Sequence, residues 1–348
     1  AGFKNVISFE MGGTTAKASL IEGGERSWTT EYEVGAGIQL SSRLVKGRGH
    51  AVRLPVLDIA EVGAGGGSIV WVDRGGALKV GPKSAGASPG PACYGTGGTE
   101  ATVTDANVVL GYISPERLAG GAVQVQPELA ARVIEARAAR PLGMSLAEAA
   151  LGVHTVANTT MIRALKAVST YRGRDPREFA LFAFGGNGPV HAAGLARALG
   201  ISTVVVPPAP GLFSAVGMLE AEPEHHFVQT FFARAEDTAD SAVEAAFAEM
   251  EGRAKNALAA DRYRAPSVRW RRRADVRYAG QAFELTVDAS APRPAGGTPI
   301  LIGALVQRFH AEHQRTYGHH APGESVELVN LRVAALLAGS RVRANQAE

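Results

Sequence analysis

The stretch FEMGGTTAK, at positions 9–17, decides the fold of this chain. An apolar run at 4–9 leads into it, and a second apolar run at 16–21 follows it. Two strand-like runs joined by a glycine-rich connection predict a β-hairpin. Because Gly12 and Gly13 have no Cβ atom, their backbone N–H groups can approach a phosphate group closely. The stretch therefore predicts a phosphate-binding loop, and an ordinary tight hairpin turn is the alternative.

The side chains of this stretch suit a phosphate group with its metal ion. The hydroxyl groups of Thr14 and Thr15 can donate hydrogen bonds to phosphate oxygens, and the Glu10 carboxylate can hold Mg²⁺ through water. The candidate nucleotide-binding residues in this stretch are Glu10, Gly12, Gly13, Thr14, Thr15 and Lys17.

A second glycine-rich loop, GGNGP at 185–189, lies between an apolar run at 179–184 and a predicted helix that continues through Leu199. A strand predicted at 203–206 completes a β-loop-α-β unit, which implies a parallel sheet. The helix would direct its unpaired N–H groups and positive dipole end at the loop. The loop is neither a P-loop nor a dinucleotide fingerprint, because the Gly-Lys-Ser/Thr sequence and the third glycine are missing. We expect the two loops to grip one nucleotide, with candidates Gly185, Gly186, Asn187 and Gly188.

Two further segments are candidates for the same cleft. GAGGGS at 63–68 precedes a predicted second hairpin, and GPKSAG at 81–86 follows it. Gly65 and Gly66 are assigned to the nucleotide, and glycines that serve only the hairpin and its loops are the alternative.

The segment TVTDAN, at 102–107, opens a short predicted helix. Asp105 is either a second carboxylate beside the metal, together with Glu10, or a helix cap. His191 lies in the first turn of the helix that follows Gly188, and we expect it near the ligand.

The chain divides into two predicted domains, a nucleotide-binding domain at 1–223 and a C-terminal α+β domain at 224–348. In the first, a helix is predicted at 145–171, with Ser145 and Glu148 as a capping box. The second is predicted to contain helices at 238–260 and 299–316 and strands at 268–279, 282–288 and 326–337. His310 and His313 have a spacing that can bind metal, but a solvated helix face is the expected position for both.

Composition excludes several classes of protein. The 348 residues suit two domains, and 46% hydrophobic residues are enough for a sizeable core. The formal net charge is only +3, and the one basic run, at 269–273, lies in a strand-like sequence, so no nucleic-acid partner is expected. A single cysteine, Cys93, forms no disulfide framework and favours a cytoplasmic location. No membrane span and no signal peptide are recognisable.

The motifs occur in an order that resembles the hydantoinase/oxoprolinase family, in particular its A subunit. The resemblance extends to N-methylhydantoinase, 5-oxoprolinase and the acetone and acetophenone carboxylases. The runs that carry it include FEMGGTTAK (9–17), EVGAGGGSI (61–69), VGPKSAGASPGPACYGTGGT (80–99), TVTDAN (102–107), AFGGNGPVHA (183–192), DVRYAGQAFEL (275–285) and YGHHAPGESVELVNLRV (317–333).

The resemblance implies an α/β fold of the actin/sugar-kinase superfamily, a ribonuclease H-like mixed sheet with flanking helices, in which two related halves close over ATP. It implies ATP and Mg²⁺ as cofactors, phosphorylation of the ring amide oxygen of a small cyclic amide, and a hydantoinase B-type subunit as partner, with a homo-oligomer as a further option. A ketone carboxylase subunit and a non-catalytic assembly module are the alternatives.

Two departures from the family pattern matter. The family chain begins with a further domain that carries an earlier phosphate loop, and Ala1 opens this chain without it. We therefore expect this chain to be inactive alone, because phosphoryl transfer needs positioning from both sides. The family also has Asp where this chain has Glu10, which alters the reach of the metal ligand.

Overall fold

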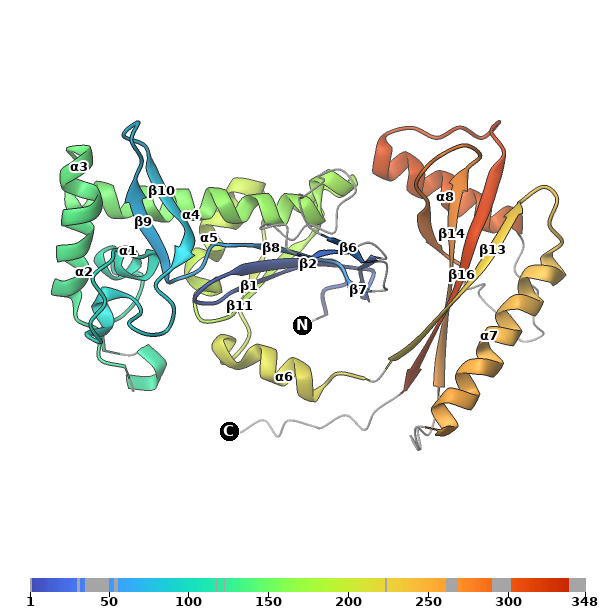
Figure 1. Cartoon of the computed structure of the whole chain (residues 1–348), viewed down its shortest axis with the longest axis horizontal. Helices are drawn as coiled ribbons and strands as arrows, with labels where there is room; N and C mark the ends of the chain where they lie inside the picture. The colour runs from blue at the N-terminus through green and yellow to red at the C-terminus, as the bar shows by residue number, and fades with distance from the viewer. Residues whose placement is uncertain are drawn as a thin grey trace. The chain divides into compact units, whose positions relative to one another are not determined.

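The structure is a computed structural model that describes residues 2–29, 32–34, 50–52, 56–116, 118–121, 123–222, 224–260, 268–289 and 302–337 (Figure 1). Its contacts divide the chain into two compact units, Ala1–Ser214 and Ala215–Glu348. This division precedes the boundary expected after residue 223, and Pro223 itself lies outside the described residues. Each unit is described by itself.

A mixed six-stranded sheet forms the centre of the first unit. Its strands are β1 (Val6–Met11), β2 (Ala16–Glu22), β3 (Glu25–Arg26), β8 (Ile59–Val62), β11 (Ala180–Phe184) and β12 (Val204–Val205). The order is β12-β11-β1-β2-β3, and β8 pairs with β2. The hairpin of β1 and β2 is antiparallel, whereas β1, β11 and β12 run parallel. The predicted hairpin and the predicted parallel unit are both confirmed.

Two helices cover one face of this sheet (Figure 1). Helix α4 (Leu146–Val168) begins at the predicted capping box, in which Ser145 and Glu148 bond each other's backbone N–H. Helix α5 (Gly188–Leu199) follows β11 and ends at Gly200, which has a left-handed backbone. The core between the sheet and these helices includes Ile7, Phe9, Met161, Leu165, Leu181 and Leu195.

The rest of the first unit consists of short elements. A hairpin of β9 (Ser68–Val72) and β10 (Leu78–Ser84) precedes α1 (Val103–Val109), α2 (Pro127–Ile134), a π-helical turn (Glu135–Ala139) and α3 (Arg140–Leu142). Two-stranded ladders join β4 (Trp28–Thr29) to β7 (Val56–Leu57) and β5 (Tyr32–Val34) to β6 (His50–Val52). Single 3-10 turns occur at Ala92–Tyr94, Leu118–Gly121, Thr170–Arg172, Pro176–Glu178 and Pro210–Leu212.

The second unit is an α+β structure, as predicted, and α6 (Phe213–Leu219) spans the division between the units. Its antiparallel sheet contains β13 (Glu224–Arg234), β14 (Val268–Tyr278), β15 (Leu285–Asp288) and β16 (Val326–Leu337), in the order β13-β16-β14-β15. Helices α7 (Asp240–Ala260) and α8 (Ile302–Tyr317) bury Phe247, Met250, Leu305 and Phe309 against one face.

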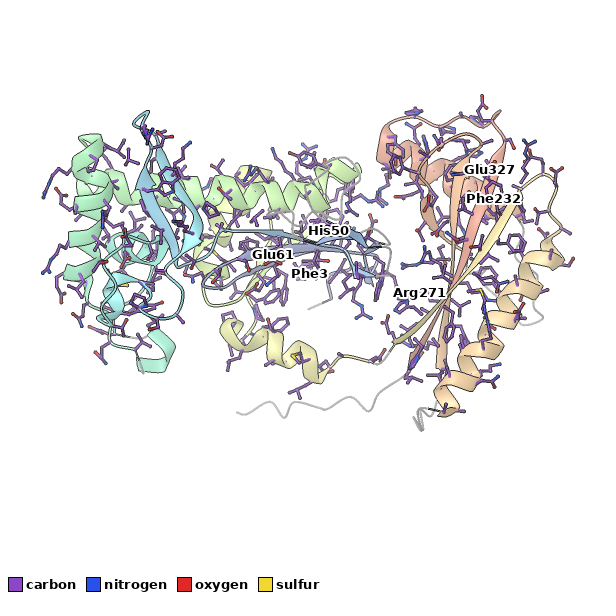
Figure 2. All side chains as sticks on the ribbon, in the orientation of Figure 1. Phe3, His50, Glu61, Phe232, Arg271 and Glu327 are labelled. Atoms are coloured by element: carbon purple, nitrogen blue, oxygen red, sulfur yellow. The ribbon has the colours of Figure 1, made fainter. Side chains whose placement is uncertain are left out.

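The other face of this sheet contains a buried carboxylate. Asp275 is fully buried, and its carboxylate accepts hydrogen bonds from Arg332 at 2.6 Å, Thr286 at 2.7 Å and Asn330 at 2.9 Å. Arg271, Phe232 and Glu327 are labelled along this sheet in Figure 2.

The prediction that His310 and His313 project into solvent is wrong. Both side chains are buried, because this face of α8 packs against Tyr278 at the end of β14 and against the segments that carry Gln281 and His319. The Tyr278 hydroxyl lies 2.7 Å from His310 Nδ1, and Gln281 lies 3.3 Å from His313 Nε2. Among the described residues, no group of three His, Cys, Asp or Glu side chains is arranged to hold a metal ion. No described helix is long and apolar enough to cross a bilayer.

Candidate functional site

The hairpin tip between β1 and β2 packs directly on the glycine segment that precedes β9. Gly66 N–H donates to the Gly12 carbonyl at 3.0 Å, and Gly67 N–H donates to the Gly13 carbonyl at 2.7 Å. A Cβ atom at Gly65 would lie 2.5 Å from both the Gly13 carbonyl carbon and the Thr14 nitrogen. Two backbones can lie this close only where glycine is present.

The second glycine-rich loop meets the same hairpin tip from β11. Asn187 N–H donates to the Met11 carbonyl at 2.9 Å. Gly185 has a φ of +84°, and a Cβ atom there would lie 2.5 Å from that same carbonyl oxygen. The site exists because β1 and β11 are parallel neighbours, so their carboxyl ends meet at one edge of the sheet.

The N-terminus of α1 is a fourth component. Thr104 donates to the Gly66 carbonyl through its backbone N–H, at 2.8 Å, and through its hydroxyl, at 2.9 Å. A Cβ atom at Gly66 would lie 2.3 Å from Asn187 Nδ2 and 2.7 Å from Thr104 Oγ1. Gly66 is therefore enclosed between the two helices that begin at the site.

Asp105 caps α1, as the alternative interpretation of the sequence has it. The side chain is fully buried and forms a capping box with Thr102. Its oxygens accept hydrogen bonds from the Cys93 N–H at 2.8 Å and from the Thr102 hydroxyl at 2.7 Å. Cys93 is buried too, and desolvation by burial is the main reason that the pKa of its thiol lies well above the ordinary value. These bonds establish the cap interpretation of Asp105, and its metal role beside Glu10 stays a prediction.

Glu10 is the acidic group at the edge of the site. It ends β1 opposite Lys17 of β2, and the Lys17 ammonium lies 3.8 Å from Glu10 and 4.0 Å from Glu61 of β8. Figure 2 labels Glu61 on that neighbouring strand. Partial burial raises the pKa of the Glu10 carboxyl, Lys17 acts in the opposite direction, and Glu61 reinforces the rise. The carboxylate also faces Gly185, where a Cβ atom would lie 2.9 Å from Glu10 Oε1.

The hairpin tip presents backbone donors outward. Gly13 and Thr14 are exposed, and Thr15 accepts a backbone hydrogen bond from Gly12 at 3.1 Å. The N–H groups of Gly13, Thr14 and Gly186 form no hydrogen bond with another described residue. Backbone N–H groups at a glycine-rich turn and at a helix N-terminus are the donors that bind anions in proteins.

The structure thus brings together the residues predicted at 10–17, 65–66 and 185–188. Thr104 is a component that the sequence did not reveal, although its place in TVTDAN, beside the suspected Asp105, was a usable signal. His191 was expected near the ligand. Its side chain is instead fully buried and bonds other side chains behind the loops.

Comparisons with known proteins agree with this architecture. A hydantoinase/oxoprolinase family model matches residues 1–227. An uncharacterised protein of Methanocaldococcus jannaschii is 41% identical over 95% of this chain and 46% of its own length. The caprolactamase subunit alpha of Pseudomonas jessenii is 33% identical over 96% of this chain and 46% of its own length.

Two solved structures share the fold. The ATP-dependent caprolactamase from Pseudomonas jessenii has a TM-score of 0.81 at 33% identity, covering 98% of this chain and 47% of that one. A nucleotide-free structure of acetone carboxylase has a TM-score of 0.66 at 26% identity, covering 97% of this chain and 47% of that one. The chain thus spans about half the length of these relatives. Since the family model covers well over half of its residues, this chain belongs to the hydantoinase/oxoprolinase family.

Proposed function

We propose that the first unit binds the phosphates of Mg·ATP for an enzyme that opens a cyclic amide. The observation that carries the proposal is the convergence of the segments at 12–14, 65–67 and 185–188, with unbonded N–H groups at Gly13, Thr14 and Gly186. Close backbone contacts leave no room for a Cβ atom at Gly65 or Gly185, and the side chains of Asn187 and Thr104 leave none at Gly66. Such a cradle fits an anion, whose charge the outward N–H groups stabilise.

Within this proposal each residue has a separate task. The N–H groups of Gly13 and Thr14 and the Thr14 hydroxyl hold phosphate oxygens, and Lys17 adds positive charge beside them. Glu10 holds Mg²⁺ through water, and its raised pKa falls again when the cation binds, because an opposite charge favours the carboxylate. Gly188 and Asn187 border the nucleoside.

The chemistry belongs to the whole enzyme, of which this chain corresponds to about half. When bound, ATP supplies a phosphoryl group that converts an amide oxygen into a leaving group. The part of the relatives that this chain does not match would close over the nucleotide from the other side, as in the actin/sugar-kinase superfamily, and a B-type subunit would complete hydrolysis. The caprolactamase likeness, at a TM-score of 0.81, favours a lactam as the substrate class.

A second candidate function is activation of a ketone for carboxylation. The likeness to acetone carboxylase, over 97% of this chain, supports it. Both candidates place the same loops around the same nucleotide and differ in the substrate. A non-catalytic assembly module is the third option, and it predicts that nucleotide does not bind.

The test is calorimetric titration of Mg·ATP and Mg·ADP into this chain, followed by thermal unfolding with and without nucleotide. We expect saturable binding that also raises the melting temperature, because a ligand that binds only the native state stabilises it. Thr14→Ala should abolish both effects. The control is Thr159→Ala, an exposed threonine of α4 that bonds only its own helix. Absence of binding, both here and in a chain extended to the full length of its relatives, would refute the proposal.

A further inference from the structure

A chain of hydrogen bonds crosses the three helices behind the glycine loops. His154 Nδ1 lies 2.8 Å from Asn107 Oδ1, Asn107 Nδ2 lies 3.1 Å from His191 Nε2, and His191 Nδ1 lies 2.7 Å from Asn158 Oδ1. Asn107 and His191 are fully buried, and His154 is 8% exposed. We call these four residues the His–Asn chain.

All hydrogen bonds of the His–Asn chain run in one direction. An amide oxygen only accepts, so His154 and His191 must each donate from Nδ1. His191 Nε2 then accepts from the Asn107 amide, which only donates. Every polar atom named here has a complementary partner, provided that His191 is neutral and carries its proton on Nδ1.

The two imidazole rings also stack. Their centroids are 4.4 Å apart and their planes differ by 9°, and Tyr112 meets the outer face of His154 edge-on at 5.2 Å. Among the described residues, the titratable groups that pack here by ring contacts are His154, on His191, and Tyr112, on His154. Burial, followed by the proximity of His154, holds the pKa of His191 at about 3, which agrees with the neutral form.

The His–Asn chain is tied to the candidate site at both helix N-termini. Asn107 lies one helical turn after Thr104, which bonds the Gly66 carbonyl. His191 lies one turn after Gly188, at the start of the helix whose cap, Asn187, bonds the Met11 carbonyl. His154 and Asn158 lie one turn apart on the third helix, α4, where His154 bonds Asn107 and Asn158 bonds His191. Helix α5 approaches α4 this closely at Gly194, where a Cβ atom would lie 2.7 Å from Asn158 Nδ2.

We propose that the His–Asn chain is a positioning device for the nucleotide site, which fixes the N-termini of α1 and α5 against the hairpin tip without touching the nucleotide. This inference rests on the proposed function. Asn107 and His191 each bond two other members across helix boundaries, and His191 does so with both ring nitrogens, so its protonation state decides whether both of its bonds form. It acts only as the neutral Nδ1–H tautomer.

The first experiment is spectroscopic and needs no nucleotide. In the full chain labelled with ¹⁵N-histidine, two-bond ¹H–¹⁵N correlations should show one buried histidine, assigned by its loss in His191→Gln, as the Nδ1–H tautomer from pH 8 to pH 5. Titration of this ring within that interval, or an Nε2–H tautomer, would overturn the arrangement even if nucleotide binds.

The second experiment measures the dissociation constant of Mg·ADP in matched variants. His191→Gln keeps a donor for Asn158 and an acceptor for Asn107 and should stay near the wild-type affinity, whereas His191→Leu should bind about tenfold more weakly, the effect of roughly one lost buried hydrogen bond transmitted to the site. If His191→Leu does not fold, Gly194→Ala serves instead, with Gly252→Ala of α7, which meets no atom within 4 Å, as its control.

Asn107→Asp tests the protonation state of His191 through the pH dependence of nucleotide affinity. A carboxylate at 107 leaves His191 Nε2 without a donor unless that nitrogen is protonated, so the variant should bind Mg·ADP more tightly as the pH falls from 8 to 5.5, while the wild type does not change in this way. Equal affinity of the wild type, His191→Leu and Gly194→Ala would overturn the proposal. A wild-type protein that binds no nucleotide, either as this chain or extended to the full length of its relatives, would instead refute the proposed function and leave the tautomer result standing.

Discussion

Gly65 lies so close to Gly13 that one added methyl group would contact the backbone of the hairpin tip at 2.5 Å. The obstacle is backbone and not the end of a flexible side chain, so it cannot rotate away. We expect Gly65→Ala to lower the free energy of unfolding by about 1–3 kcal/mol, the usual cost of overpacking, and to remove nucleotide binding. Urea unfolding and calorimetry measure the two effects.

The matched control is Gly186→Ala in the neighbouring loop, where an added Cβ atom meets nothing within 4 Å. Its free energy of unfolding should stay within about 0.5 kcal/mol of the wild type. Equal destabilisation by the two substitutions would show that the contact between the loops is not what requires glycine at 65.

Glu10→Gln should separate stability from binding. Burial raises the pKa of Glu10, so the folded chain takes up a proton more readily than the unfolded chain, and charging this carboxyl costs stability above that pKa. The variant should therefore melt at a higher temperature than the wild type at pH 7, and the difference should shrink as the pH falls through the acidic range. It should also lose Mg²⁺-dependent nucleotide binding.

Glu61→Gln is the control for this prediction, because Glu61 shares Lys17 with Glu10 but lies on β8 and not on the hairpin. It should retain Mg²⁺-dependent binding. A Glu10→Gln variant that binds Mg·ADP as the wild type does would exclude the metal role of Glu10.

His191 should make the first unit sensitive to acid. Its pKa lies at about 3 in the folded chain and near 6.5 when unfolded, so unfolding takes up a proton between these values. The stability that it contributes is complete above about pH 6.5 and declines progressively as the pH falls toward 3. His191→Gln, which cannot titrate, should lose stability less steeply in urea unfolding between pH 7 and pH 4. Parallel curves for the two proteins would contradict this, and exposed His319→Gln should follow the wild type.

Asp275→Ala should damage only the second unit. The substitution leaves the Arg332 guanidinium half-buried without its carboxylate, and breaking a buried pair in this way costs about 3–5 kcal/mol. Because the two units have separate cores, the affinity of the first unit for Mg·ADP should not change. A parallel loss of affinity, measured by calorimetry well below the melting temperature, would show that the units are energetically coupled.

Local sequence rules predicted elements of both units well. Helix α4 begins where Ser145 and Glu148 placed it, and β16 occupies 326–337 as predicted. These elements are specified by neighbouring residues, through capping and through alternation of apolar positions. The same rules placed the β1–β2 hairpin because its glycines interrupt two apolar runs.

Residues whose role depends on distant partners were harder to predict. His310 and His313 have a spacing that can bind metal and were expected on a solvated helix face, yet Tyr278 and Gln281 cover them. Asn107 and His191 are 84 positions apart, and no periodicity in the sequence links them. The sequence around Asp105 suits both a metal ligand and a helix cap, and the bonds of its oxygens to Cys93 and Thr102 establish only the cap.

The parallel pairing of β1 with β11 has a consequence for biosynthesis. Met11 and Asn187 bond each other beside the hairpin tip, yet most of the sequence of the first unit lies between them. A ribosome that releases the chain from its N-terminus therefore exposes the glycine hairpin long before the loop that completes it. If the proposed function holds, nucleotide cannot bind the nascent protein until β11 and the start of α5 have emerged, so it would stabilise only a nearly complete first unit and would not guide early folding.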